Sequence, residues 1–323
     1  MKIGLLTDAL EHIATLDEVV AWCAARELEA VELGVGGYSS SPHAARSELR
    51  ADRSERERLI GSLARHDIEL AALNVSGNPL HPRPEVARQH DLALHEAVQL
   101  AAMLDVRRVV AMSGCPGNPG GSGDWPVFAG GAWLPDMEGL WDRQWSQAIA
   151  PYWTELSEWA AREAPEVRIC LELHPGTSIY NAESFLRLRG VTGPNVCVNL
   201  DPSHFWWQGI DPVTTIELVG DRIGFVHGKD TIVHPDRVAR HGLLDFRWPT
   251  DPNEMPWHFA AVGTSRPASE WADLLAALTA AGYDDVVSIE HEDPRLTPEA
   301  GIETSLRGLR DACDQARRQK AGT

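Results

Sequence analysis

Eight short apolar runs alternate with longer segments of helical pattern along this 323-residue chain, and this alternation constrains the fold more than any other feature. The runs are Ile3–Asp8, Ala30–Gly34, Leu70–Ser76, Arg108–Ser113, Val167–His174, Val196–His204, Ile223–Asp230 and Val286–Glu292. Several consist almost entirely of Val, Ile and Leu, which is typical of buried parallel strands. The helical patterns lie between them, at about 17–28, 47–66, 84–104, 144–164, 181–190, 211–219, 269–281 and 297–316.

Strict alternation of strands and helices predicts a parallel sheet, and eight strand–helix units are enough to close a barrel. The alternative is an open, doubly wound sheet, which is expected to carry a glycine-rich phosphate-binding turn after its first strand. The segment Thr7-Asp8-Ala9-Leu10-Glu11 is not such a turn. We therefore predict an α/β fold, a (β/α)8 TIM barrel. It would form a single domain over residues 1–316, followed by a disordered tail at 317–323.

Two connections are too long to be simple loops, and both follow predicted strands. Pro116–Arg143 comes after the fourth strand and Ile232–Pro267 after the seventh. This places them at the C-terminal face of the barrel, where such enzymes carry their active sites. Presumed loops at this face hold seven of the 12 tryptophans, which we expect to stack on a sugar or to form a subunit interface. They are Trp125, Trp133, Trp141, Trp206, Trp207, Trp248 and Trp257.

The composition limits which partners the protein is expected to bind and in which compartment it is expected to lie. The 29 basic and 47 acidic residues give a net charge of −18, which argues against nucleic-acid binding. No apolar stretch approaches the roughly 20 residues of a membrane span, and the first residues have no secretory pattern. The five cysteines are odd in number and include no Cys-x-x-Cys pair, which favours a reducing compartment. We expect a cytoplasmic protein.

The last four predicted strands all end in residues that can bind a metal. Side chains alternate along a strand, so residues two apart share a face. If Ile169, Leu171 and Leu173 face the helices, Cys170 and Glu172 face the barrel axis, and His174 continues the same parity. The same reasoning on the next three strands turns one ligand-type side chain of each toward the axis. The converging residues are Glu172, Asp201, His227 and Glu290.

Three carboxylates and an imidazole favour a divalent ion with mostly oxygen ligands. We expect Mn²⁺, with Mg²⁺ or Co²⁺ as alternatives. Any one of these residues taken alone is more readily explained as a buried ion pair or a helix cap. Together, however, three buried carboxylates need more positive charge than His227 and Lys229 supply. The sequence therefore predicts a metal site.

At these residues the chain resembles the xylose isomerase-like TIM-barrel superfamily, which holds sugar isomerases, ketose 3-epimerases, inosose dehydratases and endonuclease IV. The resemblance spans nearly the whole chain and is strongest in an ordered series of motifs. They are Leu171-Glu172-Leu173-His174-Pro175, Asn199-Leu200-Asp201-Pro202-Ser203-His204, His227-Gly228-Lys229-Asp230 and Ser288-Ile289-Glu290-His291-Glu292-Asp293. The acidity of the chain disfavours the endonuclease branch.

The resemblance to the epimerase-like members implies roles for these residues. Glu172, Asp201, His227 and Glu290 would be the metal ligands. Glu172 and Glu290 would also form the catalytic acid–base pair, and His204 would contact the substrate. Further candidates for substrate contact are His174, Lys229, Asp230, Trp206 and His258. For His174 and His258, and for Asp230 as a partner of Lys229, a structural role is an open alternative.

The expected function is a metal-dependent sugar isomerase or epimerase that acts on a polyhydroxylated carbonyl compound through an enediolate. The alternative is a lyase that eliminates from the same intermediate. It would be either a dehydratase of keto-inositol type or a deglycosidase of 3-keto C-glycosides. A non-catalytic sugar-binding barrel is the third hypothesis. We expect a small sugar or keto-sugar as substrate and a homo-oligomer, or a hetero-oligomer with a small subunit for the deglycosidase.

Overall fold

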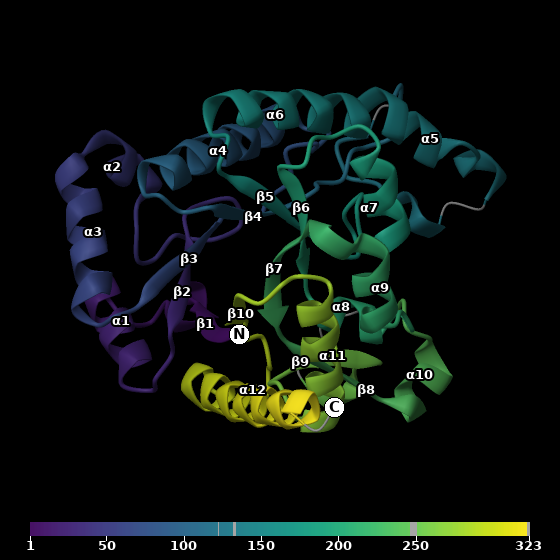
Figure 1. Ribbon diagram of the computed structural model, residues 1–323. Coiled ribbons are helices and arrows are strands. Elements are labelled where there is room, and N and C mark those ends of the chain that lie inside the picture. Colours follow the sequence, from purple (N-terminus) through teal and green to yellow (C-terminus); the bar gives the residue numbers. More distant parts are fainter. Residues whose placement is uncertain (122, 132–133, 246–250, 322–323) are drawn as a thin grey trace.

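In the computed structural model, eight parallel strands close into a barrel in the order β1-β10-β7-β6-β5-β4-β3-β2, which confirms the predicted (β/α)8 architecture. The structure describes residues 1–121, 123–131, 134–245 and 251–321. Helices surround the barrel, with α4 and α6 on one side and α12 on the opposite side (Figure 1). The barrel strands are β1 Lys2–Leu6, β2 Ala30–Gly34, β3 Glu69–Asn74, β4 Arg108–Met112, β5 Arg168–Glu172, β6 Val196–Leu200, β7 Ile223–Gly228 and β10 Val286–Ile289.

Each of the last four barrel strands is shorter at its carboxyl end than the sequence predicts. For β6 the reason is Pro202, which lacks the N–H that would continue the ladder and stands just before α8 (Ser203–Trp206). As a result Glu172 is the last residue of β5, and Asp201 directly follows β6. Glu290 directly follows β10, so these carboxylates all lie at the C-terminal face of the barrel.

Helices follow the predicted segments with one clear division. The predicted helix at 47–66 is two helices, because Asp52 has an extended backbone (φ −118°, ψ 120°) and its side chain caps the second helix at Ser54 N–H. The helices around the barrel are α1 Leu16–Ala24, α2 Arg46–Ala51, α3 Arg53–Arg65, α4 Pro84–Met103, α5 Leu140–Gln144, α6 Ala150–Glu163, α7 Ala182–Arg189, α9 Pro212–Val219, α11 Ala268–Ala280 and α12 Pro298–Ala321. A π-helical turn, Trp145–Ile149, joins α5 to α6.

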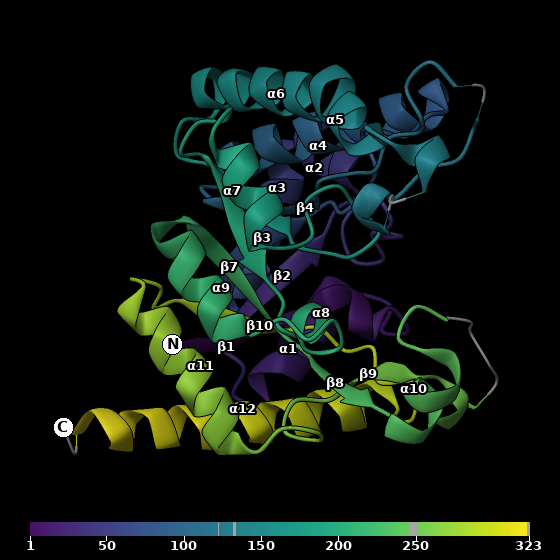
Figure 2. The ribbon, with the colours of Figure 1, turned by 90° about the vertical axis from the view of Figure 1, so that its right-hand side faces the viewer.

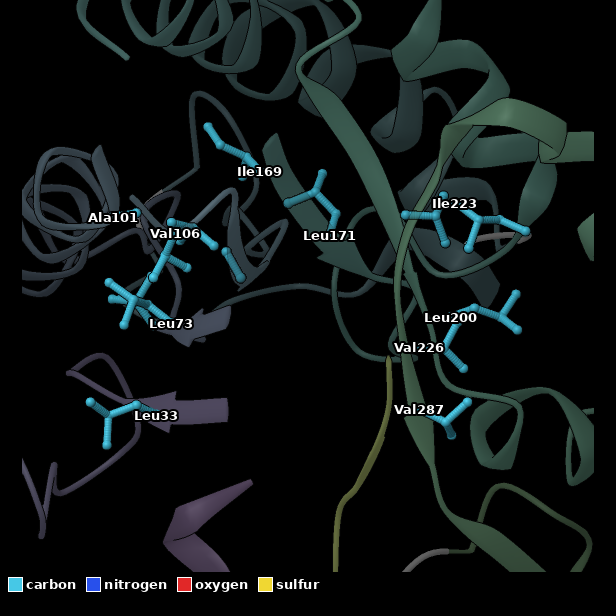
Figure 3. Packing of buried hydrophobic residues seen from close by; sticks show 14 of the residues in the cluster. Leu33, Leu73, Ala101, Val106, Ile169, Leu171, Leu200, Ile223, Val226 and Val287 are labelled. Carbon is cyan, nitrogen blue, oxygen red and sulfur yellow. The ribbon is translucent and has the colours of Figure 1, made fainter. Parts of the chain in front are cut away.

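Two apolar layers hold the barrel together. Outward-facing strand residues form one buried cluster with residues of the helices, such as Ala101 of α4. Figure 3 shows part of this cluster, including Leu33, Leu73, Ile169, Leu171 and Val287. A second, smaller cluster fills the barrel interior below the C-terminal face. It consists of Ala30, Ala71, Ala72, Val110, Cys170, Cys197, Phe225 and Val286. The inward parity assigned to Cys170 is therefore confirmed, and Phe225, two residues before His227, faces the same interior.

The predicted long connection Ile232–Pro267 has structure of its own that the sequence did not reveal. β8 (Asp230–Val233) pairs antiparallel with β9 (Trp257–Ala260), and α10 (Pro235–His241) lies between them in the chain. The other long connection, Pro116–Arg143, contains short 3-10 turns at Ala129–Gly131 and Pro135–Met137. Figure 2 shows both segments on the same side of the molecule, away from the chain's N-terminus.

The C-terminal segment and the cysteines can also be compared with the predictions. The segment 317–323, expected to be a disordered tail, is helical as far as Ala321 because α12 continues to that residue; residues 322–323 lie outside the described part. All five cysteines are free thiols. Among the described helices, none combines the length and the apolar character that a membrane crossing requires.

Candidate metal centre

Four side chains meet at the C-terminal face of the barrel, each from a different strand or strand end. Each offers one ligand atom, and these atoms all lie within 4.8 Å of one another. The four are the predicted ligands Glu172, Asp201, His227 and Glu290. Their convergence follows from the shared inward parity of β5, β6, β7 and β10.

Within and beside the cluster, His227 and Lys229 lie in direct contact with carboxylates. His227 Nδ1 lies 2.9 Å from Glu290 Oε2 and 3.8 Å from Glu172 Oε1. Lys229 Nζ lies 3.0 Å from Asp201 Oδ2 and 2.8 Å from Glu290 Oε2. A third carboxylate, that of Glu292, also accepts a hydrogen bond from Lys229 at 2.8 Å. Lys229 is only 2 % exposed, so its charge acts on these carboxylates with little screening.

Two further histidines border the cluster. His204 Nε2 is 2.9 Å from Glu172 Oε1 and 3.4 Å from Asp201 Oδ2. The His174 ring lies beside the His204 ring, with their centroids 4.1 Å apart. The structure therefore brings two of the three predicted contact histidines, His204 and His174, to the centre.

The ion pairs outweigh burial in setting the protonation of the cluster. Burial alone raises the pKa of Glu290, but the charges on Lys229 and His227 lower it to about 2. Burial alone lowers the pKa of Lys229, but Asp201, Glu290 and Glu292 raise it well above its usual value. For His174 burial dominates and His204 adds to it, so that its pKa falls to about 4. The His174 imidazole is therefore neutral near pH 7.

The donor set fits a divalent cation. Three carboxylates and one imidazole are the ligand types that Mn²⁺, Mg²⁺ or Zn²⁺ accept. Asp201 Oδ2 is buried and makes no hydrogen bond within the described part of the chain, although Lys229 Nζ lies 3.0 Å and His204 Nε2 3.4 Å from it. A buried carboxylate oxygen without a hydrogen bond is costly, and a metal ion would satisfy it.

Glu32 belongs to this centre, although the sequence reasoning missed it. It lies on β2, its side chain is fully buried, and its Oε2 is 3.1 Å from His227 Nε2. The signal was present in the sequence: Glu32 is a charged residue in the middle of an otherwise apolar strand. Glu32 lies far from the four ligands in the sequence, and only barrel closure brings β2 near β7. The contact could therefore not be predicted.

Two predicted contact residues, Asp230 and Trp206, face other partners. Asp230 accepts hydrogen bonds from the backbone N–H groups of Ser265 and Arg266 and pairs with the Arg266 guanidinium, so it anchors the start of β8. Trp206 packs against Trp271, and the Arg266 guanidinium lies 4.0 Å from its ring centroid. Their contribution to substrate binding stays a prediction without a contact to the metal ligands.

His258 does not point toward the centre, because side chains alternate between the two faces of β9. Its neighbour Phe259 faces the centre, with its ring 5.3 Å from the His204 ring and 4.4 Å from Lys229 Nζ. Successive residues of a strand point to opposite faces, so His258 lies on the other face of β9, where its ring is 5.1 Å from that of His234.

Two tryptophans of the presumed C-terminal-face loops, Trp207 and Trp257, pack together beside the centre. Trp207 and Trp257 stack with centroids 4.4 Å apart and an interplanar angle of 6°, and Trp257 in turn contacts Phe259. Trp141 packs with Trp145 instead, and Trp125 is 77 % exposed. Trp133 and Trp248 lie outside the described residues.

Comparison with known protein families gives one match over most of the chain. The family described as "Xylose isomerase-like TIM barrel" matches residues 20–312. Among curated proteins, the uncharacterized protein YfiH of Bacillus subtilis (strain 168) is 35 % identical over 320 residues, which is 98 % of this chain and 100 % of YfiH. Both matches include all four residues of the metal cluster, since these lie between residues 172 and 290.

Solved structures with this fold include proteins of several activities. The IolI protein with a bound zinc atom aligns with a TM-score of 0.66 at 19 % identity, covering 98 % of this chain and 99 % of its own. The probable 3-DHS dehydratase AsbF of Bacillus anthracis also gives 0.66, at 17 % identity over 96 % and 99 % of the two chains. An L-ribulose 3-epimerase gives 0.64 at 17 % identity, with 99 % and 97 % covered. At these identities the likeness is one of fold.

Proposed function

The chain belongs to the xylose isomerase-like TIM-barrel family, and from this membership we propose that it is a divalent-metal-dependent enzyme that isomerises or epimerises a sugar or keto-sugar. One observation carries the proposal. Glu172 and Glu290 come from β5 and the end of β10, which are separated in the barrel by β6 and β7. Their carboxylates therefore approach the same small volume from two directions, as proton removal on one side and proton return on another require.

The two glutamates differ in access. The Glu172 side chain is 3 % exposed and is held by His204, whereas the Glu290 side chain is 16 % exposed and is held by Lys229. We assign Glu290 to the first proton transfer, because it is the more open to a substrate that enters from the barrel mouth. Glu172 then carries out the proton transfer on the opposite side of the substrate. Lys229, as a fixed cation, stabilises negative charge that develops on a substrate oxygen.

A bound divalent cation would supply Lewis-acid polarisation of the substrate carbonyl, and Glu172, Asp201, His227 and Glu290 would hold it. Mn²⁺ is our choice because three of the four ligands are carboxylates. The zinc in the IolI structure makes Zn²⁺ the first competitor to test.

A β-elimination is the second candidate, and His174 is the observation that favours it. An elimination needs an acid for the leaving hydroxyl in addition to the base that takes the proton. His174 provides a third proton-transfer group beside the glutamate pair, since its ring contacts that of His204. Because its imidazole is neutral near pH 7, it would first accept the proton taken from the substrate and then, as an imidazolium, give that proton to the leaving hydroxyl. A stretch of 82 residues that is 36 % identical to the inosose dehydratase of Geobacillus kaustophilus (strain HTA426) agrees with this candidate.

Solvent-exchange NMR separates the candidates. The Mn²⁺-loaded protein would be incubated in D₂O with free ketoses, keto-inositols and 3-keto glycosides. An isomerase or epimerase gives a stereoisomer or isomer that carries solvent deuterium at the carbon next to the carbonyl. A lyase gives loss of water or of the aglycone. Binding of a sugar without exchange or product would contradict both and would favour a sugar-binding barrel.

A further inference from the structure

We infer that Glu32 is a positioning residue of the metal centre, which holds the His227 ring by Nε2 so that Nδ1 faces the three carboxylates. The inference deepens the proposed function and rests on it. No sequence motif marks Glu32. It reaches the centre from β2, on the side of the barrel that supplies none of the four ligands.

The two ring nitrogens of His227 face different carboxylates. Nε2 lies 3.1 Å from Glu32 Oε2 and 3.3 Å from Glu32 Oε1. Nδ1 lies 2.9 Å from Glu290 Oε2, inside the cluster. When Nε2 donates its proton to Glu32, the lone pair of the neutral ring is on Nδ1. The contact therefore selects the tautomer and the ring orientation that a cation in the cluster needs.

Glu32 is itself fixed from two other strands. Asn74 on β3 donates from Nδ2 to Glu32 Oε1 at 2.8 Å, and Ser288 on β10 donates from Oγ to Glu32 Oε2 at 2.8 Å. Asn74 is oriented in turn, because its Oδ1 accepts a hydrogen bond from Ser76 N–H at 3.1 Å. The Glu32 carboxylate thus has little freedom to turn away from His227.

The surroundings argue against a role in packing alone. The layer beneath Glu32 is apolar and includes Ala30, Ala72, Phe225 and Val286. A fully buried carboxylate is expensive in such a place, and a neutral amide would serve Asn74 and Ser288 almost as well. Only His227 gains specifically from the negative charge.

The test compares Glu32→Gln with the wild type by calorimetric titration of Mn²⁺ and by the visible absorption spectrum of the Co²⁺-loaded protein. Neither readout needs a substrate. Gln keeps the size of the side chain but removes its charge, and we expect Mn²⁺ affinity to fall by about 10- to 100-fold, as for other residues that orient a metal ligand. The Co²⁺ bands should shift, because the ring is no longer held.

Ser288→Ala is the matched control, since it removes one hydrogen bond to Glu32 but keeps the contact with His227. Its Mn²⁺ affinity should stay within about threefold of the wild type, given the modest net worth of one hydrogen bond. Glu32→Asp adds a second variant in which the charge is kept but drawn back from His227. Weaker binding in Asp and Gln variants alike, with Ser288→Ala near the wild type, supports the inference.

The failures are distinguishable. Wild-type binding and an unchanged Co²⁺ spectrum in Glu32→Gln would overturn the role of Glu32 and leave the proposed function standing. If the Gln variant does not fold, the same result in Glu32→Asp would overturn it. A wild-type protein that binds neither metal would contradict the proposed function, and the inference would fall with it.

Discussion

Lys229 and Glu290 form a 2.8 Å ion pair in which the glutamate is also one of the four clustered ligand residues. The same ammonium group lies 3.0 Å from Asp201, a second member of the cluster. Without a metal, Lys229 is thus a resident cation that neutralises part of the site. A divalent ion would have to share both carboxylates with it.

Lys229→Gln should therefore change metal binding and stability in opposite directions. Removing one partner of a buried ion pair costs about 3–5 kcal/mol, so the metal-free protein should unfold at a lower temperature. Mn²⁺ affinity should rise at least about tenfold, because a divalent ion held by the same carboxylates would be repelled by the Lys229 ammonium, an interaction on the order of several kcal/mol at an effective dielectric constant near 20. Calorimetric titration and thermal unfolding measure both effects. Weaker Mn²⁺ binding would mean that Lys229 orients the carboxylates instead.

The barrel and the four ligands could be predicted because both depend on local periodicity. Strand–helix alternation sets the topology, and a period of two sets which strand residues face the axis. Glu172 and Glu290 then need only the same parity on different strands to meet. Strand parity does not depend on how far apart two residues lie in the chain, which is why these residues could be identified from the sequence.

What the sequence did not reveal depends on contacts between distant segments. Glu32 meets His227 only when the barrel closes, and a single charged residue in an apolar strand carries no mark of its partner. The β8–β9 pair is similar, since Thr231 and Phe259 lie in short runs whose pairing no local rule specifies. The side to which His258 points could not be predicted for the same reason: its face follows from the position of β9, not from its residue type.

Two helical glycines should respond oppositely to substitution by alanine. In an open helix the change stabilises a protein by about 0.5–1 kcal/mol, and a new Cβ on Gly61 of α3 would meet only Arg65 Nη1, at 3.8 Å. On Gly308 of α12 the Cβ would lie 2.5 Å from the backbone oxygen of Val262. We expect Gly308→Ala to destabilise by about 1–3 kcal/mol in urea unfolding. Equal gains in both variants would mean that α12 is not packed against Val262.

His95 should give a pH-dependent contribution to stability that is independent of the metal centre. Its Nδ1 lies 3.2 Å from Asp91 Oδ1, and the hydrogen bond to Asp91 raises the pKa of His95. The contribution is fully present below the unfolded-state pKa of about 6.5 and is lost as pH rises through the higher folded-state value. The melting temperature of the wild type minus that of His95→Gln should thus be larger at pH 6 than at pH 8.5. A difference that grows with pH would contradict the sign of the shift.

Glu172→Gln and Glu290→Gln should separate proton transfer from metal ligation when they are compared with Asp201→Asn. All three replace a carboxylate of the cluster by an amide of similar size, so all three should weaken metal binding. Only the glutamates have been assigned a proton to move. With Mn²⁺ raised until each variant is fully loaded, Asp201→Asn should regain most of its turnover. The glutamate variants should stay about 100- to 10,000-fold below the wild type, the usual cost of a lost general base.

Turnover would be followed by NMR on the substrate identified in the exchange experiment, and metal content would be measured on the same samples. Recovery of Glu290→Gln to the level of Asp201→Asn would show that Glu290 is a ligand without an acid–base role.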